Sequence, residues 1–191
     1  MEFLEDSLYI EKVLNGDTSA YTTLVNKHKD MVFTIARKIA RSTEDAEEIA
    51  QDAFIKAFQS LEKFKQRSKF STWLYRITYN TAVSRVRKKN IEVSVIDDEV
   101  IENYPGEQIY EFVEAMDDQR QQRFIDAALE KLPPEDNVVI TLFYLEEYSI
   151  GEISKITALS KSNVKVKLHR IRKRLYKELN HIYKSQFNEV V

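Results

Sequence analysis

Positive charge gathers in two stretches of this 191-residue sequence that contain no acidic residue. The first runs from Lys63 to Lys89 and holds nine Lys and Arg, and the second runs from Lys161 to Lys177 and holds eight. Clustered cations can neutralise phosphates, and they are the electrostatic signature of a nucleic-acid binder. Most charged runs are ordinary solvated helix faces, but two acid-free basic stretches in a chain of net charge −2 favour nucleic-acid binding.

The first basic stretch also contains aromatic residues, in "KFSTWLYRITYN" (69–80), which includes the only Trp of the chain. Aromatic rings interleaved with Lys and Arg can stack on unpaired bases, and the preceding loop, 64–70, could hold an extruded nucleotide. The helix expected over 71–89 has two apolar sides: Phe70, Trp73, Leu74, Ile77 and Thr81 on one, and Tyr75, Tyr79, Ala82 and Val86 on the other. Such a helix is either buried on both sides or uses one side for a ligand, and both alternatives stay open.

The second basic stretch forms the last helix of a predicted helix-turn-helix. Pro134 opens a helix to about residue 146, and Ser149 caps a short helix, 150–156, with Glu152 completing a capping box. Ser160 caps a long helix to about residue 179, whose first residues would enter the major groove, where Lys, Arg and Asn contact base edges. Its candidate DNA-binding residues, which we expect to face outward beyond the cap, are Ser160, Lys161, Ser162, Asn163, Lys165, Lys167 and Arg170.

Composition limits the classes of protein that fit this sequence. The absence of Cys indicates a reducing compartment and excludes thiolate metal sites, and no apolar run is long enough to span a membrane. The acidic N-terminus does not resemble a secretory signal, so we expect a soluble cytoplasmic protein. His28, His169 and His181 lack metal-ligand spacing, and no phosphate loop or catalytic triad is present. We therefore predict no enzyme, metal or cofactor.

The distribution of charge predicts the domain organisation. Residues 1–89 and 119–191 each carry a net charge of +4, whereas residues 90–118 carry ten acids and no base. With few Gly and Pro residues, this pattern predicts an all-α fold of two small helical domains, 1–89 and 119–191, joined by an acidic flexible linker, 90–118. In the free protein, the acids of the linker could contact the two basic stretches and mask them from DNA.

The helix expected over 43–61 has one apolar stripe and one acidic, polar face. The stripe, which should face the core, contains Ala46, Ile49, Ala50, Ala53, Phe54, Ala57, Phe58 and Leu61. The opposite face carries Glu44, Glu48, Gln51 and Gln59, with Ile55 at its middle. A single exposed Ile is normal, but an apolar residue ringed by acids is also typical of an anchor for a basic partner, and both interpretations stay open.

Three motifs together resemble the extracytoplasmic-function (ECF) RNA polymerase sigma factors of the sigma-70 superfamily. They are "DAEEIAQDAFIKAFQSL", "FSTWLYRITYN" and "SNVKVKLHRIRKRL", and the similarity covers about residues 18–89 and 123–178. The chain departs from the family pattern at Gln66 and Ala158, where members often have Gly, at Arg67, where they often have an acid, and at Ser84, where they often have Asp.

The resemblance implies a sigma-2 domain, the linker and a sigma-4 domain, with promoter DNA and core RNA polymerase as partners. The clamp helices of the large polymerase subunit would contact Glu48, Gln51, Asp52 and Ile55. The minus-ten element would be recognised and melted by Lys69, Phe70, Trp73, Tyr75, Arg76, Asn80, Arg85, Arg87 and Lys88. The predicted helix-turn-helix would recognise the minus-thirty-five element, and an anti-sigma protein is a further candidate partner.

Two other classes of protein remain as alternatives. The first is a conventional helix-turn-helix regulator with a helical dimerisation domain, which would need an apolar, self-complementary face. The second is an RNA-binding adaptor, which the helix-turn-helix disfavours. The acidic face around Ile55 and the basic aromatic helix favour an initiation factor over both.

Overall fold

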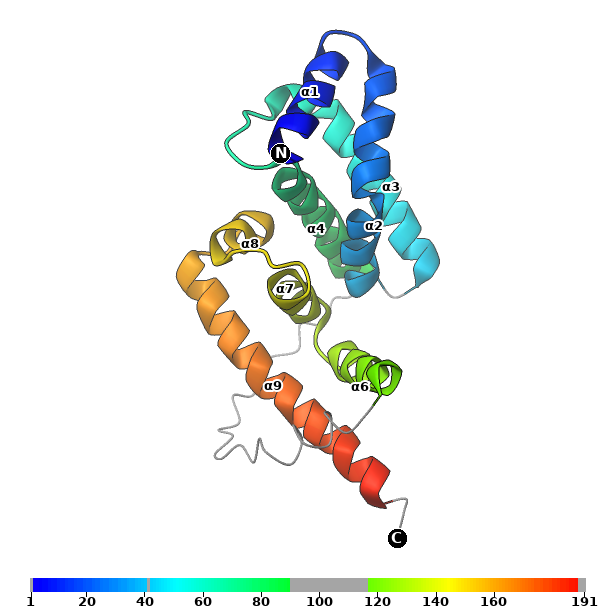
Figure 1. Ribbon diagram of the computed structural model, residues 1–191, viewed down its shortest axis with the longest axis vertical. Coiled ribbons are helices and arrows are strands. Elements are labelled where there is room, and N and C mark those ends of the chain that lie inside the picture. The colour runs from blue at the N-terminus through cyan, green and yellow to red at the C-terminus, as the bar shows by residue number, and fades with distance from the viewer. Residues whose placement is uncertain (1, 41, 90–116, 189–191) are drawn as a thin grey trace.

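The computed structural model describes residues 2–40, 42–89 and 117–188, and every regular element in these ranges is helical (Figure 1). The predicted linker therefore lies almost entirely outside the described residues, and so do its proposed contacts. The N-terminal block contains α1 (Glu2–Leu14), α2 (Tyr21–Ile39), α3 (Thr43–Gln59) and α4 (Phe70–Lys89), with 3-10 turns at Thr18–Ala20 and Leu61–Lys63. The C-terminal block contains α6 (Asp118–Glu130), α7 (Pro134–Tyr144), α8 (Ile150–Thr157) and α9 (Lys161–Asn188).

The core of the N-terminal block lies where α2, α3 and α4 pack against one another. Ser42 begins α3 by accepting a hydrogen bond from the backbone N–H of Asp45 at 3.1 Å. The apolar stripe of α3 then faces inward, with Ala46, Ile49, Ala53 and Ala57 fully buried. The prediction that the whole stripe faces the core was wrong for Phe58. Its side chain is 40% exposed, because its ring lies at the edge of the block against Tyr21.

Helix α4 is buried on both of its apolar sides. Phe70 and Leu74 lie in the core on one side, and Tyr75, Tyr79 and Ala82 are buried on the other. Both sides are covered because α4 packs against α2 and α3 and also against α8 of the C-terminal block (Figure 1). Helices α2 and α7 also touch, so the buried residues of the two blocks form one hydrophobic cluster.

The helix-turn-helix follows the predicted signals closely. In α8, the Ser149 side chain accepts a hydrogen bond from the Glu152 backbone N–H, and the Glu152 carboxylate accepts one from the Ser149 backbone N–H. Ser160 Oγ accepts a hydrogen bond from the backbone N–H of Asn163 at 3.1 Å, which begins α9. Val164, Leu168 and Ile171 then bury one side of α9, which packs against α6, α7 and α8.

Two of the positions at which the chain departs from the family pattern that it resembles adopt left-handed backbone conformations. Gln66, in the loop before α4, has a φ of 51°, and Ala158, in the turn of the helix-turn-helix, has a φ of 61°. A residue with a Cβ atom in this region costs roughly 1–2 kcal/mol relative to its favoured conformations. Both turns therefore keep their shape in spite of local strain.

We expect Ala158→Gly to raise the free energy of unfolding by about 0.5–1 kcal/mol. Glycine removes the strain of the left-handed conformation, and the larger conformational freedom of the unfolded glycine chain offsets part of the gain. Urea denaturation followed by circular dichroism measures the change. The control is Ala127→Gly within α6, which should lower the stability by up to about 1 kcal/mol. A lower free energy of unfolding for Ala158→Gly would show that the backbone of Ala158 is not strained.

Candidate nucleic-acid interface

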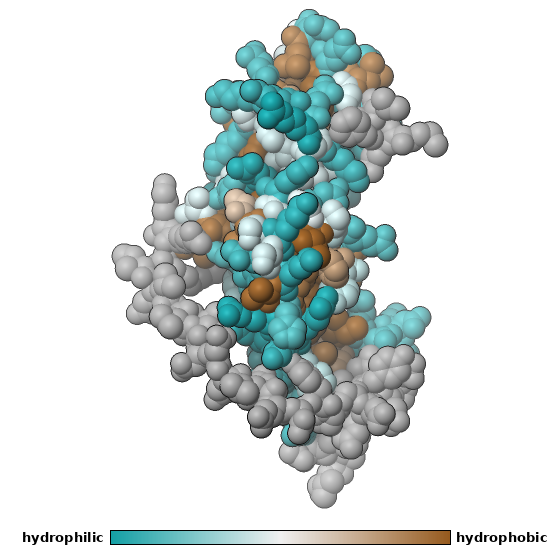
Figure 2. Space-filling view, turned by 90° about the vertical axis from the view of Figure 1, so that its left-hand side faces the viewer, coloured by the Kyte–Doolittle hydropathy of each residue, from teal (hydrophilic) through white to brown (hydrophobic). Residues whose placement is uncertain are grey.

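The first turns of α9 present an open polar surface. Lys161, Ser162, Asn163, Lys165 and Arg170 are exposed. Val166 lies among them and is 48% exposed, an apolar side chain that the sequence analysis did not select. Figure 2, which looks onto the side of the molecule where α8 and α9 lie, shows hydrophilic side chains interrupted by hydrophobic patches near the middle of this face. This surface offers hydrogen-bond donors for base edges and phosphates.

Lys167 does not share this exposed surface, contrary to the expectation that it faces outward. Its ammonium group forms an ion pair with the buried carboxylate of Asp136 on α7, which also accepts a hydrogen bond from Arg174 at 2.9 Å. Asp136 is buried, so it requires cationic partners, and two side chains of α9 supply them. In this arrangement Lys167 ties α9 to α7.

The predicted minus-ten residues divide into exposed and buried groups. Lys69, Arg76 and Asn80 are exposed, whereas Phe70 and Tyr75 are buried and Trp73 packs against Phe64 and Phe70. Arg87 and Lys88 belong to the last turn of α4. The structure thus places Arg76 and Asn80 on α4 and Lys69 just before it, but leaves most of the aromatic surface inside the protein.

The acidic face of α3 is open, and an arginine of α4 joins its acids. Ile55 is 54% exposed, Glu48 and Gln51 are also exposed, and Asp52 is half-exposed. Arg85, which we predicted to contact DNA, forms ion pairs with Glu48 and, at 3.6 Å, with Asp52. The exposed ring of Phe58 enlarges the apolar centre of this surface.

The two blocks meet at a contact made mainly by α4 and α8. The Tyr75 and Tyr148 rings pack edge to face with centroids 6.0 Å apart, and the side chains of Ser71 and Tyr75 lie near the Tyr148 hydroxyl. Lys69 Nζ lies 3.5 Å from Glu152 Oε1. Burial raises the pKa of Tyr148. Burial alone would also raise the pKa of Glu152, but hydrogen bonds from Ser149 and the nearby Lys69 hold this pKa below its usual value.

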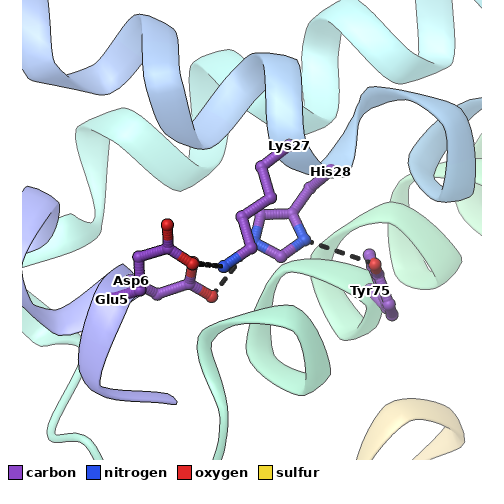
Figure 3. A network of polar contacts seen from close by, with 5 residues as sticks. All are labelled: Glu5, Asp6, Lys27, His28 and Tyr75. Atoms are coloured by element: carbon purple, nitrogen blue, oxygen red, sulfur yellow. Dashed lines mark hydrogen bonds and ion pairs between the residues drawn. The ribbon is translucent and has the colours of Figure 1, made fainter. Parts of the chain in front are cut away.

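A buried polar network lies beneath this contact (Figure 3). His28 on α2 is buried, with Nε2 at 3.1 Å from Asp6 Oδ2 and Nδ1 at 3.4 Å from the Tyr75 hydroxyl. Lys27 Nζ lies 2.8 Å from Asp6 Oδ1 and also pairs with Glu5. The sequence contained no signal for this network, because its acids and its histidine are far apart along the chain.

An apolar groove of about 330 Å³ runs between α6, α7 and α9. Its lining includes Ile125, Leu129, Tyr144, Leu145 and Leu175, and the first three come from α6 and α7. Tyr144 and Leu145, at the end of α7, are both more than half exposed. The sequence analysis missed these residues because they continue the apolar run of a helix that is otherwise buried.

In the part of the chain that the structure describes, no group of three or more His, Asp and Glu residues could hold a metal ion. None of the described helices has the length and hydrophobicity needed to cross a bilayer. A helical block with a basic helix, followed by a helix-turn-helix, defines the chain as a DNA-binding protein.

Comparison with known proteins shows which family of DNA-binding proteins this is. Residues 24–91 match the model of Sigma-70 region 2, and residues 123–175 match that of Sigma-70, region 4. The chain is 32% identical over 178 residues to the ECF RNA polymerase sigma factor SigW of Bacillus subtilis, covering 89% of this chain and 94% of SigW. It is 30% identical over 177 residues to the ECF RNA polymerase sigma-E factor of Escherichia coli K12, and the match covers 90% of this chain and 92% of that protein.

Solved structures share the fold at lower sequence identity. CnrH, in complex with the cytosolic domain of CnrY, superposes with a TM-score of 0.63 at 21% identity, covering 91% of this chain and 96% of that one. RpoE from Bartonella quintana, in complex with the anti-sigma factor NepR, gives a TM-score of 0.61 at 20% identity, and the match covers 84% of this chain and 96% of RpoE. The chain belongs to the extracytoplasmic-function family of RNA polymerase sigma factors. It acts in promoter-directed transcription initiation, and a conventional regulator with a dimerisation domain is not favoured.

Proposed function

We propose that this sigma factor binds core RNA polymerase through the exposed face of α3 and contacts the two promoter elements through α4 and α9. Residues 1–89 would act as the sigma-2 domain and residues 119–191 as the sigma-4 domain, in the cytoplasm. The observation that carries the proposal is the separation of surfaces: acids surround Ile55 on α3, whereas exposed cations lie on α4 and α9. A surface with acids around an apolar centre suits a basic protein partner and repels DNA.

Arg85 supports this division of roles within the N-terminal block. Its guanidinium lies among Asp45, Glu48 and Asp52, so it reduces the repulsion between these acids and positions them for a partner. We therefore assign Arg85 to the support of the polymerase-binding surface, while the exposed side chains of Arg76 and Asn80 remain available to a DNA strand.

The direct test is reconstitution with purified core RNA polymerase. The full chain should co-elute with the core enzyme and start transcripts at a defined subset of genomic fragments. A chain that binds duplex DNA specifically without polymerase, and that starts no transcripts with it, would support a conventional regulator instead.

We also propose an anti-sigma protein as a regulatory partner. Two structural relatives were solved in complexes whose partners include NepR and the cytosolic domain of CnrY. The apolar groove between α6, α7 and α9 offers a surface for such a partner, because exposed apolar side chains at Tyr144 and Leu145 gain most from being covered.

Two lysines of α9 provide a matched test of the recognition helix. Lys165→Ala should weaken binding of the polymerase-bound protein to the minus-thirty-five element by about 1–3 kcal/mol, if this lysine contacts a base edge. Lys167→Ala removes the same charge, but its ammonium already pairs with Asp136. We expect Lys167→Ala to lower the melting temperature and to leave DNA affinity largely unchanged. Equal losses of affinity for both variants would contradict the assignment.

A further inference from the structure

The contact between the blocks places an aromatic ring and a carboxylate on the predicted minus-ten surface of α4. The ring belongs to Tyr148, in the loop before α8, and the carboxylate belongs to Glu152, in the first turn of α8. They meet Tyr75, Ser71 and Lys69, which lie at the start of α4 or just before it. An unpaired nucleotide presents the same two groups to a protein, a flat ring and an anion.

We propose that Tyr148 and Glu152 occupy a nucleotide-binding subsite formed by Lys69, Ser71 and Tyr75, so that the C-terminal block competes with the single-stranded minus-ten element for α4. This inference rests on the proposed function, which assigns that element to α4. The Tyr148 ring takes the place of a base beside Tyr75, and the Glu152 carboxylate takes the place of a phosphate beside Lys69.

Three features indicate a contact that can open. Besides the apolar packing of α4 against α8 and of α2 against α7, it contains the Tyr75–Tyr148 ring pair, one ion pair whose side chains are both partly exposed, and a long hydrogen bond from Lys155 Nζ to the Arg67 carbonyl at 3.5 Å. Partly exposed ion pairs of this kind are weak and salt-sensitive. The two blocks belong to one chain, however, so their high effective concentration allows a weak contact to form without a partner.

The contact hides only one of the two DNA-binding surfaces. The exposed residues at the start of α9, including Asn163 and Lys165, do not take part in it. The closed protein can therefore present its recognition helix, while the subsite on α4 is filled. If nine molecules in ten are closed, the apparent Kd of a strand for that subsite rises about tenfold.

The test uses the full chain and a fluorescently labelled single-stranded DNA twelve-mer. Its sequence comes from the minus-ten element of a promoter transcribed by the reconstituted polymerase. Tyr148→Ala removes the ring from the contact and leaves the cap between Ser149 and Glu152 intact, and Glu152→Gln removes the negative charge beside Lys69 while its amide oxygen can still accept the Ser149 hydrogen bonds. Glu130→Gln is the matched control, because it makes the same change of charge at an exposed position of α6, outside the contact.

We expect both contact variants, without polymerase, to bind the twelve-mer about three- to tenfold more tightly than the native chain, and the control to bind about as the native chain does. Circular dichroism melts show whether each variant is folded. Folded variants whose affinity is unchanged or weaker would overturn the proposal. So would an equal gain in the control, because it would show a general effect of charge.

A locked form tests the same proposal from the other direction. The native chain has no Cys, so Arg67→Cys with Lys155→Cys can be joined specifically by a short, reducible bifunctional thiol reagent. We expect the joined protein to bind the twelve-mer at least about tenfold more weakly, and reduction to restore binding. Unchanged binding in the joined form would overturn the inference while leaving the proposed function in place, since the latter depends on promoter-specific transcripts made by the native chain.

Discussion

Replacing Ile55 with glutamate should weaken the binding of this sigma factor to core RNA polymerase by roughly 2 kcal/mol or more, about thirtyfold in Kd. Ile55 is half exposed at the centre of an acidic surface, so in the free protein the new carboxylate remains in water and the fold is retained. In the complex the same carboxylate would be buried at the point where an apolar anchor is expected. Competition binding with labelled core polymerase measures the change.

Leu8→Glu is a suitable control for this experiment. Leu8 lies on α1 and is 52% exposed, close to the 54% of Ile55, so the two substitutions have the same chemistry at different places. We expect Leu8→Glu to leave the affinity unchanged. If neither variant binds more weakly while both remain folded, the polymerase contacts another surface, and Ile55 is an ordinary exposed side chain.

Asp6→Ala should lower the free energy of unfolding by about 2–3 kcal/mol. The substitution leaves the buried His28 without its carboxylate partner and removes the ion pair that joins α1 to Lys27 on α2 (Figure 3). Asp6→Asn keeps the shape of the side chain and some hydrogen bonding, so its loss should be smaller. Chemical denaturation at neutral pH measures both losses.

The contribution of Asp6 should also depend on pH. Burial alone would raise the pKa of Asp6, but hydrogen bonds from His28 and Lys27, and their charges, hold this pKa below its ordinary value. The carboxylate therefore stabilises the fold fully above the pKa of the unfolded state, about 4, and loses this effect as the pH falls through the lower pKa of the folded state. The gap in melting temperature between the native chain and Asp6→Asn should then narrow below about pH 4. A constant gap would exclude this linkage.

The helices and their caps were largely predictable from the sequence, because their signals are local. Ser149 with Glu152, Ser160 before α9 and Pro134 at the start of α7 each act within one turn of helix. The exposure of Ile55 also followed from helical spacing within α3.

The remaining features depend on contacts between residues distant in sequence. Tyr75 is buried because α8 and the loop before it cover α4, and helical periodicity could not decide between burial and a ligand. Lys167 turns inward because α7 places Asp136 beside it. The network around His28 draws on α1, α2 and α4 together, so no single segment indicated it.

The contact between Lys69 and Glu152 also has a consequence for the geometry of promoters. It brings the two DNA-binding blocks together, whereas minus-ten and minus-thirty-five elements lie about 25 base pairs apart, about 85 Å along the helix axis. The 27 residues between Lys89 and Asp117 can span at most about 90–100 Å. Under the proposed function, a promoter complex that engages both elements has therefore lost this contact.

Each base pair added between the elements lengthens the span by about 3.4 Å and turns one element by about 35° relative to the other. The spacing of the elements would then select promoters independently of the bases within them.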